Sequence, residues 1–291
     1  MCLVCSDKDL EAFLFGYSPH DSSPFRRVAI CRSCGHIQRS PLPSLSDYTR
    51  FNNNFFASRY SHNPEQHQAN IKVKLKVLES RLGSHMRTGL SILDIGAGQG
   101  WLLDYVQSQS CDYFAVEPGP ELSASIESRG GTVIGGGLSE DYEDYEAAFD
   151  IIVLRHVLEH LLDPSSALRR VKKMLKPTGM AYVALPNAGL PLLRKGFRTQ
   201  FIHATHISYF CAGNLRRLGA SAGLRQVAGE AKGELWALFK REAGVLLPQD
   251  NYYVQQKAVF RRSARSALGK DIMVLAKSLA NPVVQRIRNW R

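Results

Sequence analysis

The chain has 291 residues, which is enough for two folded units, and hydrophobic residues make up 44% of it, which excludes an intrinsically disordered protein. No apolar run approaches the roughly eighteen residues of a membrane span. The net charge of +11 is uneven, because the segment from Lys257 onward carries nine basic residues and one acid, a net +8, and the rest of the chain only +3. A uniformly basic body would indicate nucleic acid, so we expect no nucleic-acid partner.

Two cysteine pairs mark the N-terminal segment, residues 1–45. Each pair has the spacing C-x-x-C, and the four residues are Cys2, Cys5, Cys31 and Cys34. Four thiolates in two such knuckles are typical of a closed, tetrahedral and therefore structural zinc site, whereas a thioredoxin-like redox pair would need a βαβ setting. His20 and His36 stay open as substitute ligands, and free thiols are the alternative to a metal. The first ten residues carry no apolar signal region, so we expect a cytoplasmic protein.

The middle of the chain, residues 46–240, has the pattern of an α/β domain. A helix is expected at 65–82, and short apolar strands that alternate with helices follow it. The strands are expected at 91–95, 113–116, 150–154, 180–185, 224–227 and 235–239. This alternation predicts βαβ units and a Rossmann-like, doubly wound, mostly parallel sheet. Cys111 and Cys211 are expected to fill its core.

One helix of this domain can be bounded from its own residues. Asp163 is a good N-cap and Pro164 fits the first helical position. An apolar stripe that includes Leu175 and a basic last turn that includes Lys176 extend the helix up to Pro177, which stops it before the next strand.

A glycine-rich loop follows the strand at 91–95 and opens a helix. It reads G-x-G-x-G over residues 96–100 and is preceded by Asp94, but Trp101 stands where a dinucleotide fingerprint would need glycine. Glycines let the backbone turn tightly and approach a ligand, and the N–H groups at a helix N-terminus attract a carboxylate or phosphate. Glu117 ends the next strand, where its carboxylate can accept hydrogen bonds from both hydroxyls of a ribose.

This arrangement resembles the first motif of the class I S-adenosylmethionine-dependent methyltransferases. Residues 149–164 are similar to the fourth-strand motif of the "LEH" methyltransferases, and residues 175–187 are similar to their fifth strand. The resemblance implies S-adenosylmethionine as cofactor and a seven-stranded sheet. It places the adenine beside residues 137–138, where backbone groups replace the Asp of many relatives. The implied cofactor-binding residues are Tyr60, Asp94, Gly96, Gly98, Gly100, Glu117, Pro118, Leu138, Arg155 and His156.

A zinc-binding module joined to such a domain resembles the sugar C-methyltransferases of deoxysugar pathways, and residues 31–43 resemble their second knuckle and exit segment. Tyr60 would then be an aromatic lid near the cofactor. Those enzymes carry a Glu-His pair where this sequence has Thr205 and His206. We predict His206 to be the general base, with His203 second, because histidine is suited to remove a hydroxyl proton. The alternative is that His206 only ties its loop to the sheet.

The sequence therefore predicts an enzyme that transfers a methyl group from S-adenosylmethionine to a small molecule, a sugar hydroxyl of a nucleotide sugar or glycan. A lipid-like or polyketide acceptor, and a non-catalytic binding protein on the same fold, stay open as alternatives. Residues 241–291 are predicted to be a basic helical tail, with apolar residues at helical spacing over 260–279. It either docks on its own protein or a second subunit, or attaches peripherally to the anionic inner face of a membrane.

Overall fold

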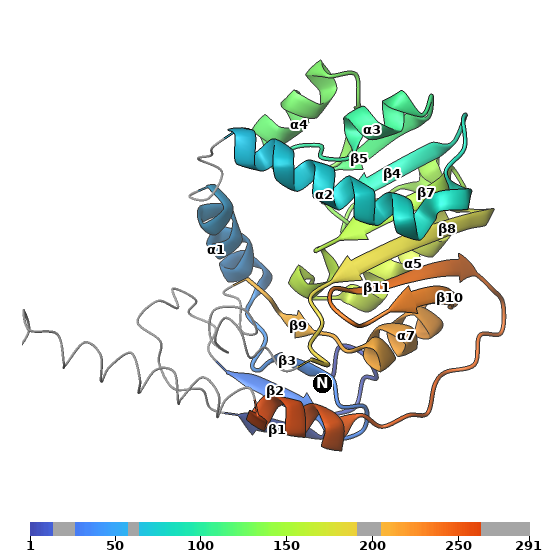
Figure 1. Ribbon diagram of the computed structural model, residues 1–291. Coiled ribbons are helices and arrows are strands. Elements are labelled where there is room, and N and C mark those ends of the chain that lie inside the picture. The colour runs from blue at the N-terminus through green and yellow to red at the C-terminus, as the bar shows by residue number, and fades with distance from the viewer. Residues whose placement is uncertain (14–26, 58–63, 191–204, 263–291) are drawn as a thin grey trace, which may run out of the picture.

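The computed structural model describes residues 1–13, 27–57, 64–190 and 205–262. A seven-stranded sheet lies at the centre of its fold (Figure 1). Its order is β10-β11-β8-β7-β4-β5-β6. The strands are β4 (Ser91–Ile95), β5 (Asp112–Val116), β6 (Thr132–Gly135), β7 (Phe149–Arg155), β8 (Leu175–Leu185), β10 (Leu224–Glu230) and β11 (Leu235–Arg241). Strands β4 to β8 are parallel, and β10 and β11 form an antiparallel hairpin at β8. The predicted Rossmann-like fold is confirmed, although the sequence analysis missed β6.

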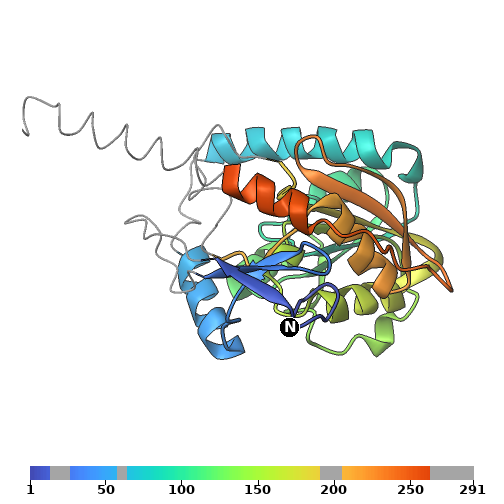
Figure 2. The ribbon, with the colours of Figure 1, turned by 90° about the horizontal axis from the view of Figure 1, so that it is seen from below.

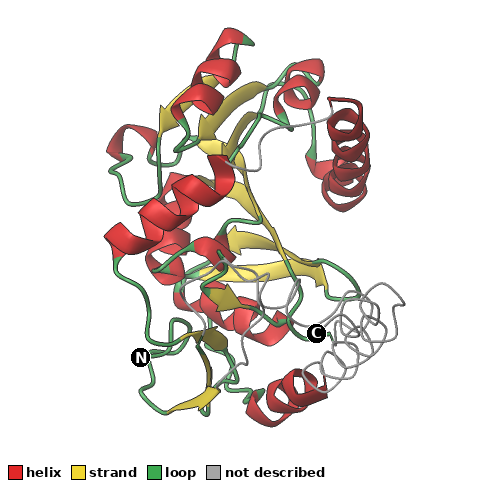
Figure 3. Ribbon diagram, turned by 90° about the vertical axis from the view of Figure 1, so that its left-hand side faces the viewer, coloured by secondary structure: helices red, strands yellow, loops and turns green. Residues whose placement is uncertain are grey.

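Helices cover both faces of this sheet, as Figure 3 shows. They are α2 (Pro64–Leu82), α3 (Leu103–Ser108), α4 (Pro120–Ser128), α5 (Pro164–Met174) and α7 (Ala212–Ser221), with 3-10 turns η1 (Gly83–His85), η2 (Glu143–Tyr145) and η3 (Leu158–His160). Successive strand residues point to opposite faces, so Leu93 and Ile95 pack with α5 and α7, whereas Ile92 packs with α2 and α3. The carboxyl ends of β4, β5 and β7 thus share one edge, where open α/β sheets bind ligands.

Helix α5 begins as predicted but ends earlier. The carboxylate of Asp163 accepts a hydrogen bond from the Ser166 amide at 2.9 Å, and Pro164 is the first helical residue. The predicted extension through Leu175 and Lys176 is wrong, because both belong to β8. Leu175 pairs with Phe149 of β7, a long-range contact that outweighs the local helical pattern, and the ammonium of Lys176 binds Asp150 at 2.6 Å.

A second, smaller sheet lies beside the first and has the order β1-β2-β3-β9. Its strands are β1 (Leu10–Phe13), β2 (Val28–Cys31), β3 (Ile37–Arg39) and β9 (Ser208–Tyr209), all antiparallel to their neighbours. The N-terminal segment supplies three strands, and the chain that follows β8 supplies the fourth. Helix α1 (Leu45–Ala57) then leads away from this sheet, in a stretch where no helix or strand was predicted.

The chain beyond β11 returns to the cysteine segment. A helix over residues 253–262 lies along the small sheet, as Figure 2 shows. The side-chain amide of Asn251 donates to the backbone carbonyl of Arg32 at 2.8 Å, and the ammonium of Lys257 binds the Glu11 carboxylate at 2.7 Å. The start of the predicted tail is therefore docked on its own protein, while most of its amphipathic segment at 260–279 lies outside the described residues. Among the described helices none is long and apolar enough to cross a membrane.

Candidate functional site

The glycine loop at the end of β4 has a backbone that only glycine adopts readily. Gly96, Gly98 and Gly100 have φ values of +70°, +58° and +67°. A Cβ on Gly96 would lie 2.7 Å from a methyl group of Val157. Positive φ at three positions and the close approach of Val157 thus require glycine in this loop.

Glu117 ends β5 and faces this loop. One carboxylate oxygen accepts a hydrogen bond from the backbone amide of Gly98 at 2.7 Å, and the other accepts one from the backbone amide of Gly119 at 2.8 Å. Burial raises the pKa of Glu117 above its usual value, and the two amide hydrogen bonds oppose that shift. The Glu117 amide donates to the Gly135 carbonyl at 3.0 Å, which brings the segment 136–138 beside it. A Cβ on Gly136 would lie 3.8 Å from Pro118, so the segment before residues 137–138 runs close to the residue that follows Glu117.

Asp94 is a buried acid beneath the glycine loop. The hydroxyl of Tyr113 donates to it at 3.1 Å, while burial raises the pKa of Asp94 to about 7. Lys74 of α2 approaches the same region, with its ammonium 5.9 Å from the ring centroid of Trp101. Burial and the charge of Arg155 lower the pKa of Lys74. Lys74 could not be predicted as a site residue, because nothing in the sequence of α2 indicates that this side chain lies near the end of β4.

A second group that the sequence analysis missed centres on Glu234, just before β11. Its carboxylate accepts from the guanidinium groups of Arg81 at 2.7 Å and Arg155 at 2.6 Å, and from His156 Nε2 at 3.0 Å. Although burial opposes it, the hydrogen bond from His156 and the charge of Arg155 lower the pKa of Glu234 to about 2. This charged group joins α2, the end of β7 and the β10–β11 hairpin, three segments that are remote in sequence.

His156 holds an unusual backbone at the end of β7. Its φ of +58° is rare for a residue other than glycine, and such backbone strain is concentrated at functional sites. Its ring contacts a carboxylate at each nitrogen, Glu159 at 3.1 Å and Glu234 at 3.0 Å. Burial opposes protonation, but these two hydrogen bonds raise the pKa of His156. His156 therefore ties the end of β7 to η3 and to the β10–β11 hairpin, at the edge where the cofactor is predicted to bind.

The loop that contains His206 lies against the turn η3, beyond the carboxyl end of β7. The rings of His206 and His160 are 4.9 Å apart and nearly perpendicular. Donor and acceptor atoms of Glu159, His160 and His206 all lie within 4.8 Å of one another. One oxygen of Glu159 is buried and has no hydrogen-bond partner among the described residues. A buried carboxylate beside two imidazoles can stabilise a proton that arrives on either ring.

The four N-terminal cysteines form one cluster, as predicted. Their sulfur atoms lie within 4.8 Å of one another, with 3.6 Å between Cys2 and Cys34 and 3.5 Å between Cys5 and Cys31. Zinc–sulfur bonds of about 2.3 Å in a tetrahedron place the sulfurs about 3.8 Å apart, so these residues fit a structural zinc ion. His36 is not part of the cluster; its Nε2 lies 3.3 Å from the Ser208 hydroxyl.

Residues 66–228, more than half of the chain, match a family model described as a methyltransferase domain. The chain belongs to this family. The ubiquinone biosynthesis O-methyltransferase of Azorhizobium caulinodans is 31% identical over 110 residues, 34% of this chain and 41% of that protein. The enzyme of the same name from Aliivibrio fischeri is 27% identical over 130 residues, 43% of this chain and 54% of that protein. The chain thus spans about half the length of these curated relatives.

The solved structure of a Burkholderia thailandensis methyltransferase has the same fold. That protein is 1,6-didemethyltoxoflavin-N1-methyltransferase, crystallised with 1,6-didemethyltoxoflavin and S-adenosylhomocysteine, and it is 20% identical to this chain. The alignment covers 78% of this chain and all of that one, with a TM-score of 0.53. The family match confirms the predicted methyltransferase domain, and this structure shows that its fold is shared.

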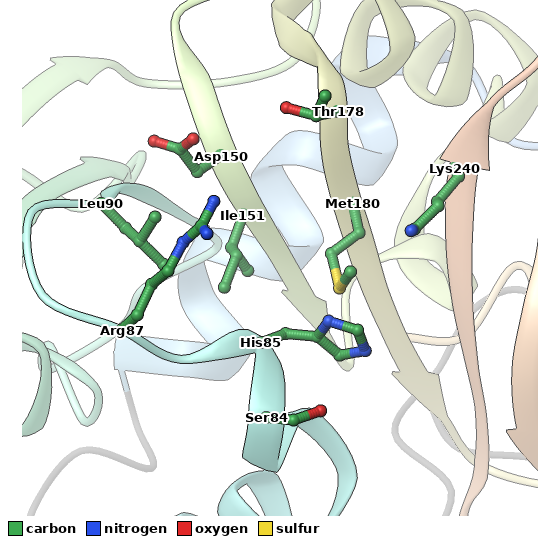
Figure 4. Close-up of a pocket in the computed structure, with 9 residues that line it drawn as sticks. All are labelled: Ser84, His85, Arg87, Leu90, Asp150, Ile151, Thr178, Met180 and Lys240. Atoms are coloured by element: carbon green, nitrogen blue, oxygen red, sulfur yellow. The ribbon is translucent and has the colours of Figure 1, made fainter.

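The structure brings most of the predicted residues of this methyltransferase domain to one edge of the sheet. Tyr60, His203 and His20 lie outside the described residues. Cys111 and Cys211 are buried, as predicted. A cavity of about 220 Å³ lies at the opposite edge, near the starts of β7 and β8. Figure 4 shows the residues that line it. The cavity contains none of the predicted site residues and is lined by Ser84, His85, Arg87, Leu90, Asp150, Ile151, Thr178, Met180 and Lys240.

Proposed function

We propose that this protein methylates a hydroxyl group of a small acceptor, and that the acceptor is a sugar in a nucleotide sugar or glycan. The observation that carries the proposal is the buried imidazole of His206, which lies beside Glu159 and His160 beyond the carboxyl end of β7. Two curated relatives that match part of the chain are named O-methyltransferases, which supports a hydroxyl acceptor. The four-cysteine module, similar to that of the sugar C-methyltransferases, supports a sugar.

The residues at the sheet edge fit the cofactor. The glycine backbone at 96–100 leaves room for its methionine part, and Glu117 presents a carboxylate that can accept the ribose hydroxyls. Pro118 and Leu138 would flank the adenine, while Asp94, Arg155 and His156 complete the pocket. When bound, S-adenosylmethionine supplies a methyl group on a positively charged sulfur, and its transfer is an in-line displacement that depends mostly on positioning.

His206 would accept the acceptor's proton. The imidazole of His206 would take up the hydroxyl proton as the acceptor oxygen becomes methylated. The carboxylate of Glu159, whose second oxygen has no partner among the described residues, would stabilise the resulting imidazolium. Thr205 stands where the sugar C-methyltransferases have Glu, which favours a hydroxyl over a carbon acid as the methylated group.

A lipid-like acceptor is the second candidate, and a specific observation favours it. The curated relatives cited above are named for ubiquinone biosynthesis. Their match covers only part of either chain, so it does not carry their acceptor over to this protein.

An acceptor screen separates these candidates. Purified full-length protein would be incubated with methyl-labelled S-adenosylmethionine and, in parallel, with nucleotide sugars, glycan extract and polyprenyl phenols. Label in a sugar product, lost in His206→Ala, is the expected result. Label only in the polyprenyl phenols would replace the sugar by a lipid-like acceptor. Failure to bind S-adenosylhomocysteine in calorimetry would favour the non-catalytic alternative.

A further inference from the structure

The second cysteine knuckle and the His206 loop, residues 205–209, belong to one hydrogen-bonded unit. Strand β3 begins three residues after Cys34 and pairs with β9, with Ile37 opposite Tyr209. The side-chain amide of Asn214, in the first turn of α7, donates to the Cys34 carbonyl at 2.8 Å. The backbone that follows Cys34 is therefore hydrogen-bonded both to β9 and to the start of α7.

Arg39, at the end of β3, contacts the backbone of His206. Its side chain is fully buried, with 0% exposure, and its Nε donates to the backbone carbonyl of His206 at 3.0 Å. Its backbone amide donates to the Ile207 carbonyl at 2.8 Å. A buried guanidinium is costly unless its donors have acceptors, so a charged donor aimed at this carbonyl fixes the His206 backbone strongly.

The other side of the loop is held by the methyltransferase domain and by α1. The Thr205 carbonyl accepts from the Tyr48 hydroxyl at 2.6 Å and from His160 Nδ1 at 3.1 Å. The Ile207 amide donates to the Glu159 carbonyl at 2.7 Å. The loop is thus held between β3 and η3. The position of the His206 ring beside Glu159 therefore depends on the position of β3.

We propose that Arg39 is a positioning residue, through which the four-cysteine module fixes the loop of the predicted base. The inference rests on the proposed role of His206. The cysteines would then do more than fold a separate module, because an ordered knuckle holds β3, β3 holds Arg39, and Arg39 holds the His206 backbone.

Hydrogen–deuterium exchange on the intact, zinc-loaded protein tests this link without an acceptor. In Arg39→Met we expect amides at 206–209 to exchange at least about tenfold faster, since the loop loses a charged hydrogen bond. Metal content, S-adenosylhomocysteine affinity and exchange at residues 93–99 should stay as in the wild type. Arg225→Met is the matched control, because Arg225 is half exposed and pairs with Glu242. Removing the metal with a chelator should also speed exchange at 206–209.

Unchanged exchange at 206–209 in a folded, metal-loaded Arg39→Met protein would overturn the proposal. If that variant does not fold, Arg39→Leu, which also lacks any donor for the His206 carbonyl, replaces it, and wild-type protection in it would be equally decisive. Chelation that loosens both knuckles yet leaves 206–209 protected would remove the link to the cysteines. The readout does not depend on turnover, so a fully active His206→Ala would end the proposed catalytic role while leaving a measured Arg39 link intact.

Discussion

Replacing Glu234 by glutamine should destabilise the methyltransferase domain through one carboxylate. Glu234 is 18% exposed and accepts from Arg81, Arg155 and His156. A pKa lowered from 4.5 to about 2 corresponds to about 3 kcal/mol of stability, which we reduce to about 2 kcal/mol because the group is partly screened by solvent. Glutamine keeps the shape but removes the charge, so two half-buried guanidinium groups lose their shared anion.

The pH dependence of this effect has a defined sign. Because the pKa of Glu234 is lower in the folded than in the unfolded chain, its contribution is fully present above about pH 4.5 and is lost as the pH falls toward about 2. Urea unfolding of the wild type and Glu234→Gln should therefore differ near pH 5 and converge in acid. Glu230→Gln, an exposed carboxylate of the same hairpin paired with Lys232, should leave stability unchanged. Equal unfolding free energies for Glu234→Gln and the wild type at pH 7 would refute the reasoning.

Three further changes test the two proposed sites. Gly98→Val should weaken binding of S-adenosylhomocysteine at least tenfold in calorimetry, because a β-branched residue resists the φ of +58°, whereas Gly233→Ala, with open space around it, should bind normally. Cys34→Ser should lower zinc content below one per chain in elemental analysis and reduce thermal stability; undiminished zinc would contradict the four-cysteine site. His206→Ala should lower turnover about 10²-fold or more and remove the histidine step from the pH–rate profile; near wild-type turnover on the true acceptor would exclude it as the base.

Local patterns predicted the parts of the fold that depend on local sequence. The apolar runs at 91–95 and 150–154 are buried on both faces in a parallel sheet, so they read as continuous strands, and Asp163 caps its helix within four residues. The glycine loop and Glu117 could be paired in advance because adjacent parallel strands end at the same edge. The start of β8 at Leu175 could not be predicted, since its partner Phe149 lies in another strand.

The charged groups of the site were harder to predict for the same physical reason. Glu234 is 78 positions from His156 in the sequence, and nothing in a short hairpin turn distinguishes an acid that binds solvent from one that binds two arginines. The signal that did exist was indirect: Arg81 lies one turn after buried Leu78 and next to buried Leu82 on α2. A basic residue on the buried side of a helix needs an anion, but only the sheet order identifies which one.

The surroundings of His206 show why a division of the chain at residue 45 has functional consequences. Its backbone is held by Arg39 from one side of that boundary, and its neighbour Thr205 is held by Tyr48 and His160 from the other. A catalytic base must stay within hydrogen-bond reach of its substrate, and a displacement of about 1 Å can cost a factor of about a hundred in rate. Strand β9 pairs with β3 of the cysteine segment. The methyltransferase domain alone would therefore not hold the backbone of His206 within such a distance. The structural zinc proposed for this segment would therefore act on catalysis at a distance, through strand pairing and one buried arginine.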